Sequence, residues 1–374
     1  MSPFAAAART TTGLTVDELE TPAAVVDLDR LDRNLERVAA YAAEHELDLY
    51  PHTKTHKTLE IAARQLELGA RGLTVAKTEE AKGFAELGAP LLVHYPVVGA
   101  AKIERIVALA ERVPVTVAVD SIEAAEPLAL ALIASGGRAE ALIEIDVGLR
   151  RTGIEPAAAG ELAAAIENLG GGLEVTGISC YPGHLRHDEA AILTGLEAVD
   201  RDLRTARAEL ESRGIDCRRI SGGSTATLFE SHRTPMTELR PGNYALLDRQ
   251  EARGAFGLDD CALRVIATVV STSVPGRIVL DAGSKSLSES PPPPGAVGFG
   301  AVADQPEITI EALSEEHGHG VNGAEGGAGL QVGSRVEVIP NHACTCVNHQ
   351  PVLFGVRGRD VVAELRPRLR GALR

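Results

Sequence analysis

The chain has 374 residues, with 37 Lys or Arg against 52 Asp or Glu, so its net charge is −15. No basic run stands out, only 3% of residues are aromatic and Trp is absent, which disfavours a nucleic-acid partner that needs phosphate contacts or base stacking. No apolar run is long enough to span a bilayer, and five cysteines are too few and odd in number for a disulfide framework, so we expect a cytoplasmic protein with no membrane partner.

The first twelve residues lack the basic leader and continuous apolar core of a signal peptide. From about residue 21 to 250, short apolar runs alternate with stretches whose apolar residues recur at helical spacing. Strands are expected at Ala23–Leu28, Leu47–Pro51, Gly72–Ala76, Leu91–His94, Val115–Val119, Leu142–Val147, Val175–Tyr181, Arg219–Ser221 and Tyr244–Leu247. Helices are expected at Leu31–His45, Leu59–Leu68, Ile103–Ala110, Ala124–Ile133, Ala157–Ile166 and Ala190–Leu210, with Asp120-Ser121 and Asp188 at helix N-caps.

Strict alternation of strand and helix implies a parallel sheet of the α/β class. Nine strands are one more than a (β/α)8 TIM-type barrel needs, so one strand belongs elsewhere or is wrongly predicted. A doubly wound open sheet is the alternative, but no G-x-G-x-x-G motif follows the first strand, which weakens a dinucleotide-binding version of it.

After about residue 250 the pattern changes to strands without long amphipathic helices. The expected strands are Leu263–Ser273, Arg277–Asp281, Arg335–Ile339, Pro351–Val356 and Asp360–Glu364. Pro291–Pro294 and the glycine-rich stretch Gly320–Gly329 are expected to be loops or linkers. We therefore predict a C-terminal, mainly antiparallel β domain beside the barrel.

The heptapeptide Pro51–Lys57 gathers two lysines and two histidines at the end of a predicted strand. The carboxyl ends of the strands are where α/β barrels carry their chemistry. A lysine held there among cationic groups can act as a nucleophile toward a carbonyl. The alternative is a solvated basic turn.

Three more loops follow predicted barrel strands. Ser221-Gly222-Gly223-Ser224-Thr225 has the small residues and hydroxyls that let a backbone approach an anion, unless it is only a flexible turn. The loop Asp146–Gly153 carries arginines that can donate to a phenolate oxygen, or simply pair with a surface carboxylate. Tyr181 and His184 are expected to face the same mouth of the barrel, although each alone is more often a packing or capping residue.

His342 and Cys344 follow the predicted strand Arg335–Ile339. In an extended segment residues i and i+2 point to the same side, and an imidazole with a thiolate suits Zn²⁺ better than Mg²⁺ or Ca²⁺. Cys346 would point the same way and His349 lies close in sequence, while Glu315-Glu316-His317 is a further possible neighbour. The competing interpretation is a buried cysteine and a structural histidine.

Taken together, these stretches resemble the D-serine dehydratase / D-threonine aldolase family of alanine-racemase-like, fold-type III enzymes that use pyridoxal 5'-phosphate (PLP). The resemblance extends in order over nearly the whole chain. Its matching stretches are Pro51–Lys57, Asp146–Gly153, Ser221–Thr225, Thr237–Tyr244, Asp281–Lys285 and Pro340–Cys344.

The resemblance implies a PLP-binding barrel over residues 21–250 and a metal-bearing β domain over 251–374 together with residues 1–20. It places the strand Ala23–Leu28 before the barrel proper, which then runs from Leu47 to about Leu247, and this accounts for the ninth strand. It also implies the site: Lys54 binds the cofactor covalently, Arg151 faces its O3′ and Tyr181 lies near the pyridine nitrogen. The phosphate cradle is Gly222, Gly223, Ser224 and Thr225 with Tyr244, next to Ser221, and the metal ligands are His342 and Cys344.

The implied activity is that of a PLP- and zinc-dependent lyase acting on small β-hydroxy D-amino acids. A His/Cys ligand pair favours zinc and the dehydratase branch, hence D-serine to pyruvate and ammonia, with Lys54 as the base at Cα. D-threonine aldolase is the alternative, with His184 as a base and with Mn²⁺ or Mg²⁺ as other metals. A racemase or a PLP-binding protein without fast turnover stays open, and the family implies a homodimer.

Two positions depart from the family pattern. The segment after the metal pair reads Val347-Asn348-His349-Gln350, where an apolar and then an acidic residue are expected, and Ala226 stands where relatives often have proline. The first departure puts the surroundings of the metal and the substrate preference in doubt.

Overall fold

The computed structural model describes residues 13–186, 188–322 and 329–374. The chain forms two compact units, each described here by itself. The described residues of Met1–Arg37, Thr55–Arg64 and Asn243–Gly371 make up the β unit, and Val38–Lys54, Gln65–Gly242 and Ala372–Arg374 make up the barrel unit. Two predictions concern residues outside the described ranges. They are the absence of a signal peptide in the first twelve residues and most of the glycine-rich loop Gly320–Gly329.

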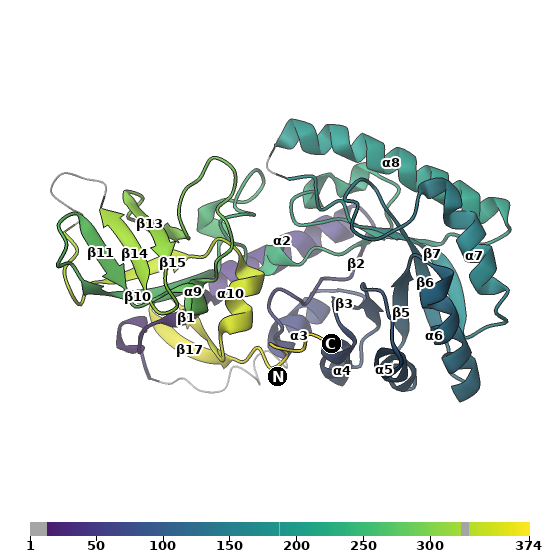
Figure 1. Ribbon diagram of the computed structural model, residues 1–374, viewed down its shortest axis with the longest axis horizontal. Helices are drawn as coiled ribbons and strands as arrows, with labels where there is room; N and C mark the ends of the chain where they lie inside the picture. Colours follow the sequence, from purple (N-terminus) through teal and green to yellow (C-terminus); the bar gives the residue numbers. More distant parts are fainter. Residues whose placement is uncertain (1–12, 187, 323–328) are drawn as a thin grey trace. The chain divides into compact units, whose positions relative to one another are not determined.

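The barrel unit contains an eight-stranded sheet in which every neighbouring pair is parallel (Figure 1). The strands are β2 (Asp48–Leu49), β3 (Leu73–Val75), β4 (Leu91–Val93), β5 (Val115–Val119), β6 (Ala139–Ile145), β7 (Leu173–Cys180), β8 (Arg219–Gly222) and β9 (Glu238–Leu239). Their order is β2-β9-β8-β7-β6-β5-β4-β3. All five residues of β5 are buried, as expected of a strand covered on both faces.

Main-chain hydrogen bonds between the first and last strands in this order close the sheet into a barrel. The Arg71 N–H donates to the Leu49 carbonyl, and the Thr74 N–H donates to the Pro51 carbonyl, both at 2.9 Å. A parallel bridge between His52 and Thr74 extends the same ladder. The predicted (β/α)8 architecture is therefore confirmed.

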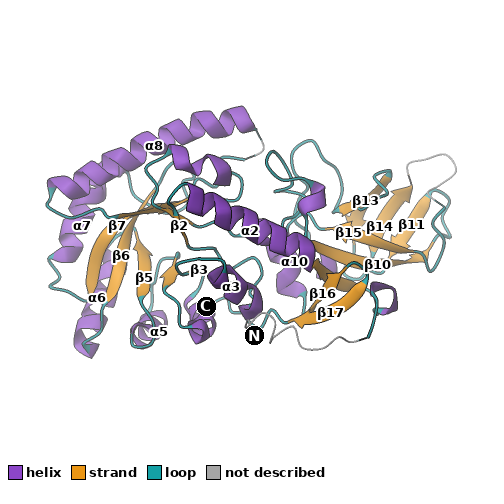
Figure 2. Ribbon diagram, turned by 180° about the vertical axis from the view of Figure 1, so that it is seen from behind, coloured by secondary structure: helices purple, strands orange, loops and turns teal. Residues whose placement is uncertain are grey.

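Helices α4 to α8 connect the barrel strands and lie on their outer side (Figure 2). The α-helices of the chain are α2 (Leu28–Glu44), α3 (Leu59–Glu67), α4 (Thr78–Phe84), α5 (Ala100–Ala110), α6 (Ile122–Ser135), α7 (Ala159–Glu167), α8 (Glu189–Ser212), α9 (Ser284–Leu287) and α10 (Ala343–His349). The carboxylate of Asp188 caps α8 by accepting from the N–H groups of Ala190 and Ala191, as predicted. Ser121 occupies the N-cap of α6 without a side-chain bond. None of the helices in the described part of the chain is long and apolar enough to cross a bilayer.

The predicted strand Tyr244–Leu247 is wrong. The eighth barrel strand is the two-residue β9, and Asn243–Ala245 forms the 3-10 turn η5 in the β unit. The N–H of Leu247 returns to the Asn243 carbonyl at 2.7 Å, and Leu247 has a positive φ of 54°. An apolar run that is fully buried does not by itself distinguish a strand from a tight turn.

The β unit is built on a second sheet in which all pairs are antiparallel except β1 with β16. Its strands are β1 (Ala23–Asp27), β10 (Leu263–Ser271), β11 (Arg277–Leu280), β12 (Ala301–Val302), β13 (Ile308–Leu313), β14 (Gly318–Asn322), β15 (Arg335–Ile339), β16 (Leu353–Arg357) and β17 (Asp360–Leu365). Because β1 pairs with β10 and β16, the surplus ninth strand belongs to this sheet, as expected. The sequence analysis missed β12, β13 and β14.

The remaining regular elements are 3-10 turns. They are η1 (Val16–Glu18), η2 (Ala85–Leu87), η3 (Pro156–Ala158), η4 (Leu228–Arg233), η5 (Asn243–Ala245) and η6 (Leu258–Asp260). Two of them matter for the site, because η4 follows the Ser221–Thr225 loop and η5 precedes the metal-ligand candidates in the β unit.

Candidate active site

The loop Pro51–Lys57 leaves β2 and is fixed by hydrogen bonds within the barrel unit. The Thr53 N–H donates to the Thr74 carbonyl at 2.9 Å, and the Lys54 N–H donates to Nδ1 of His52 at 3.4 Å. The loop residues with no exposed surface are Thr53, Thr55 and His56. The alternative of a solvated basic turn is therefore wrong, and Lys54 itself stays partly exposed.

The ring of Tyr181, directly after β7, lies close to two cations. Nζ of Lys54 is 5.5 Å from the ring centroid and the guanidinium of Arg151 is 4.9 Å from it. The ring packs against Gly183, where an added Cβ would come within 2.2 Å of it, and the Tyr181 hydroxyl accepts from Nη2 of Arg186 at 3.4 Å. Three predicted site residues from three different loops thus lie together in the barrel unit.

His184 packs on the loop that carries Arg151. The Asp146 carboxylate accepts from the N–H groups of Gly148 and Arg150, at 3.0 and 2.9 Å, which folds this loop back on itself. A Cβ on Gly148 would lie 3.2 Å from Cε1 and Nε2 of His184, so the imidazole rests against the glycine backbone. The structure thus brings His184 to the Asp146–Gly153 loop.

The end of β8 and the residue that follows it combine a buried hydroxyl with two glycines. Oγ of Ser221 is buried and has no hydrogen-bond partner among the residues that the structure describes. A Cβ on Gly222 would lie 2.7 Å from Cε of Met236, so this position is tightly packed, and the φ of +84° at Gly223 favours glycine. A buried hydroxyl that still needs a partner thus lies beside two glycines.

The rest of this loop is held by a residue that the sequence analysis missed. The Ser224 N–H donates to Oγ1 of Thr227 at 3.1 Å, and the Thr227 N–H donates to Oγ of Ser224 at 3.2 Å. These reciprocal bonds close the turn that precedes η4, whose N-cap residue is Thr227. Thr225 is buried in the same turn. Tyr244 is buried within the β unit, and the part of Tyr244 in a phosphate cradle stays a prediction.

Beneath these loops the barrel contains a buried charged cluster. Nη2 of Arg240 donates to the Cys180 carbonyl at 2.6 Å and lies 2.9 Å from Nε2 of His94. Nε2 of His94 is also 2.8 Å from Oε2 of Glu144, and this oxygen accepts from the Ser179 hydroxyl. These side chains come from separate strands, so no local sequence signal joins them.

The charges of this cluster follow from burial and proximity. Burial lowers the pKa of His94, and the positive charge of Arg240 lowers it further. Burial raises the pKa of Glu144, but His94 and Arg240 outweigh it and lower that pKa overall. Glu144 and Arg240 are therefore the charged partners, and the His94 contact with Glu144 is one of a neutral imidazole. Its Nε2 either donates to Glu144 or accepts from Arg240, and not both at once.

The candidate metal ligands lie at the start of α10. His342 is the N-cap residue with extended backbone angles, but α10 begins at Ala343, so the expected extended segment through Cys344 is wrong. Cys344 is the second residue of α10 and so lies in its first turn. Because successive residues of a helix are rotated by about 100°, His342 and Cys344 do not share a side as they would in a strand. Its Sγ is 3.3 Å from the hydroxyl of Thr55, the residue that follows Lys54 in the chain.

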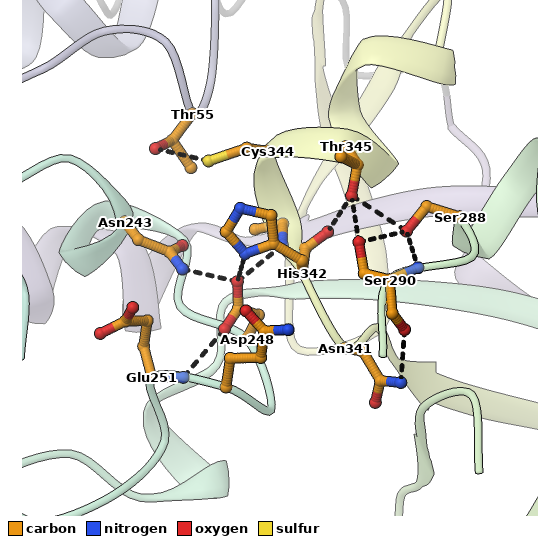
Figure 3. A network of polar contacts seen from close by, with 12 residues as sticks. Thr55, Asn243, Asp248, Glu251, Ser288, Ser290, Asn341, His342, Cys344 and Thr345 are labelled. Carbon is orange, nitrogen blue, oxygen red and sulfur yellow. Dashed lines mark hydrogen bonds and ion pairs between the residues drawn. The ribbon is translucent and has the colours of Figure 1, made fainter. Parts of the chain in front are cut away.

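Asp248, which the sequence analysis did not identify, lies beside this pair. Its Oδ2 is 3.0 Å from Nδ1 of His342, and in Figure 3 the imidazole lies between this carboxylate and Cys344. Burial lowers the pKa of His342, but hydrogen bonds to Asp248 and Cys344 outweigh burial and raise that pKa to about 11.

Cys346 does not belong to this pair. Its thiol donates to the Ser286 carbonyl at 3.1 Å, and burial raises its pKa to about 12, so the expectation that it points the same way is wrong. Glu316 instead pairs with Lys285 at 2.6 Å. No group of three or more His, Cys, Asp or Glu side chains within residues 13–186, 188–322 and 329–374 has a metal-binding arrangement. The candidate metal site therefore has two protein donors, His342 and Cys344, among the described residues.

Two family models match the chain. "Alanine racemase, N-terminal domain" matches residues 26–250, and "Putative serine dehydratase domain" matches residues 262–356. The chain belongs to the alanine-racemase-like family of D-serine dehydratases and D-threonine aldolases. Members of this family are PLP-dependent lyases, so the chain is an enzyme of this class.

Curated and solved members of the family align over nearly their whole lengths. D-threonine aldolase from Arthrobacter sp. is 33% identical over 91% of this chain and 89% of its own length, and D-threo-3-hydroxyaspartate dehydratase from Delftia sp. is 30% identical over 87% and 91%. The crystal structure of D-threonine aldolase from Filomicrobium marinum has a TM-score of 0.88 and 31% identity, covering 96% of this chain and 98% of that chain. A cysteine-to-alanine mutant of the dehydratase, solved in the metal-free form, has a TM-score of 0.86 and 29% identity, covering 95% and 99%.

The residues of the chain fit both groups that this family membership implies. An anionic phosphate suits the unpartnered Ser221 hydroxyl and the two glycines that follow it. A zinc ion suits an imidazole and a thiol at the N-terminus of one helix, with the other imidazole nitrogen bonded to a carboxylate.

Proposed function

We propose that Lys54 binds PLP covalently at the mouth of the barrel. Lys54 is partly exposed, and its amine lies near the ring of Tyr181. The guanidinium of Arg151 lies near the same ring. PLP supplies an electron sink for the breaking of a bond at Cα of an amino acid. In this proposal Arg151 donates to the cofactor's O3′, Tyr181 lies by its pyridine nitrogen, and its phosphate lies in the cradle of Ser221, Gly222, Gly223, Ser224 and Thr225 with Tyr244.

We propose further that His342 and Cys344 hold a zinc ion. The single observation that carries this step is the pairing of His342 with Asp248, because it engages Nδ1 and leaves Nε2 for a metal. Zinc supplies Lewis acidity toward a substrate hydroxyl, which is otherwise a poor leaving group. Mn²⁺ and Mg²⁺ are the alternatives, but a thiolate ligand favours zinc.

The activity that this donor set favours is dehydration of a β-hydroxy D-amino acid, with D-serine giving pyruvate and ammonia. Lys54 would accept the proton from Cα while the β-hydroxyl leaves as water. A relative that acts as a dehydratase supports this proposal, since one of its mutants that lacks a cysteine was solved metal-free. The smallest such substrate is D-serine, and a match to the serine dehydratase domain model agrees with it.

A second candidate is the aldolase reaction, in which D-threonine gives glycine and acetaldehyde. The relative with 33% identity is a D-threonine aldolase, which favours this candidate. His184 would then accept the proton of the β-hydroxyl, a role consistent with its place on the loop that carries Arg151.

The deciding experiment is a product assay on purified protein loaded with PLP and zinc. D-serine, D-threonine and D-threo-3-hydroxyaspartate are incubated separately, and 2-oxo acids, ammonia, glycine and the L-enantiomers are quantified. The proposal predicts pyruvate and ammonia from D-serine in equal amounts. Glycine without 2-oxo acid would establish the aldolase reaction instead, and L-serine alone would establish a racemase.

A further inference from the structure

Asp248 is a fully buried carboxylate whose oxygens are both occupied. Oδ2 accepts from Nδ2 of Asn243 at 2.5 Å, from the N–H of Ala343 at 2.7 Å and from Nδ1 of His342 at 3.0 Å (Figure 3). Oδ1 accepts from the N–H of Glu251 at 2.9 Å. Four donors surround one side chain with no exposed surface, so this carboxylate is held in one orientation.

The arrangement determines the proton on the His342 ring. An ionised carboxylate only accepts, so Nδ1 of His342 must carry a hydrogen that it donates to Asp248. In a neutral imidazole the free lone pair is then on Nε2. The His342 side chain keeps 27% of its surface exposed whereas Asp248 keeps none, so one side of the ring is fixed while the other is accessible.

We propose that Asp248 is a positioning residue for the metal: it fixes His342 as the Nδ1–H tautomer, so that Nε2 binds the ion. The same oxygen accepts from the Ala343 N–H and so ties the start of α10, which carries Cys344, to the same support. This inference rests on the proposed zinc site and adds a residue that binds neither the ion nor the substrate. A carboxylate behind a ligating histidine also raises the basicity of that ligand.

A purely structural role is the competing explanation, because Asp248 also satisfies backbone N–H groups. Such a role affects the stability of the fold, but it does not affect how tightly a folded protein binds zinc. The test therefore needs a metal-binding readout beside a stability readout.

The experiment compares zinc affinity of the wild type, Asp248→Asn and the control Ser290→Ala by competition with a chromophoric chelator. An asparagine of the same size cannot accept at both ends, so it loses either the Glu251 bond or the bonds on the His342 side. We expect Asp248→Asn to bind zinc about 10- to 100-fold more weakly, the usual effect of removing such a partner. Ser290 bonds to Thr345 and Ser288 near α10 but not to the imidazole, so Ser290→Ala is expected to match the wild type.

Each outcome decides the inference. Unchanged zinc affinity in folded Asp248→Asn overturns it while leaving the zinc site intact. A wild type that binds no zinc overturns the zinc site and with it this inference. If Asp248→Asn does not fold, nitrogen-15 NMR of histidine-labelled, zinc-loaded wild type replaces it, with His342→Gln for assignment. Zinc on Nε2 of His342 is expected, and zinc on Nδ1 would overturn the inference.

Discussion

At the residue scale, side chains from three loops meet at the ring of Tyr181. The ring of Tyr181 is bordered by the Lys54 amine and the Arg151 guanidinium, and each comes from a loop after a different strand. Planar guanidinium groups stack on aromatic faces and donate in a fixed direction, which an ammonium cannot do. The identity of the cation at position 151 therefore matters, and its charge alone is not enough.

Arg151→Lys is expected to lower kcat/KM by roughly 2- to 5-fold, the range of a cation–π contact at an exposed site. The exposed neighbour supplies a matched control, since Arg150→Lys changes the same loop without touching the Tyr181 ring. Steady-state assays with the best substrate measure both. Equal effects of the two substitutions would contradict the role given to Arg151.

Some residues of the candidate site could be predicted from the sequence and others could not. Short motifs near the ends of expected strands indicated Pro51–Lys57, Asp146–Gly153, Tyr181 and the pair His342/Cys344. The family resemblance then singled out Lys54 and Arg151, and the roles of all these residues stay predictions. The sequence did not identify Asp248 or Thr227. Asp248 directly follows the turn that was misread as a strand, and Thr227 acts through its bonds with Ser224. A buried polar side chain is defined by its partners, and these are not visible in a local pattern.

At the element scale, the barrel strands bring opposite charges into a dry interior. Glu144 on β6 and Arg240 after β9 are both buried, and the imidazole of His94 contacts both of them. Breaking a buried charged pair is costly because it leaves one charge uncompensated.

Glu144→Gln is expected to lower the free energy of unfolding by roughly 3–5 kcal/mol, because Arg240 then loses its buried counter-charge. Urea unfolding followed by circular dichroism measures this change. The control is Glu174→Gln, whose exposed partner is Arg218 and whose effect should stay within about 1 kcal/mol. A cost for Glu144→Gln no larger than the control would show that Arg240 is not balanced by Glu144.

His94 gives this cluster a pH dependence whose sign follows from its lowered pKa. Burial and the Arg240 charge keep it unprotonated in the folded state, whereas in the unfolded chain its pKa is about 6.5. The unfolded state thus binds more protons, and the stability contributed by His94 is full above about pH 6.5 and falls below it by up to ~1.4 kcal/mol per pH unit. Unfolding curves between about pH 5 and 7.5 should show this slope in the wild type and a shallower one in His94→Gln. Parallel slopes in the two proteins would contradict the neutral state of His94.

Secondary structure was predictable where periodicity is strong. The run Ala190–Leu210 with its Asp188 cap became α8, and Val115–Val119 became β5. Short elements were not predictable, because β9 and β12 have two residues each and Tyr244–Leu247 is as apolar as a strand. The segment His342–Cys344 was expected to be extended, but α10 begins at Ala343. No apolar repeat in the sequence indicates that helix start.

At the scale of the whole molecule, the residues proposed to bind PLP and zinc belong to two different compact units. Lys54, Tyr181 and the Ser221–Thr225 loop belong to the barrel unit, and His342 and Cys344 belong to the β unit. The alternation of strands and helices predicted the barrel, and the change of pattern near residue 250 predicted a second sheet. The expected homodimer stays a prediction.

Removal of the metal is therefore expected to abolish turnover while PLP stays bound, because no residue proposed to hold the cofactor is a metal ligand. Treatment with a chelator, followed by gel filtration, separates the two effects when the visible absorption of PLP and the product assay are measured together. Added zinc should restore turnover. Turnover that survives complete removal of metal would contradict the proposed part of His342 and Cys344.

The most direct test of the whole account is to reduce the PLP-loaded protein with borohydride and to map the modified peptide by mass spectrometry. The account predicts one pyridoxyl adduct, on the amine of Lys54, and none on Lys57 in the same peptide region. An adduct on another lysine of an active preparation, or an unmodified Lys54, would contradict it.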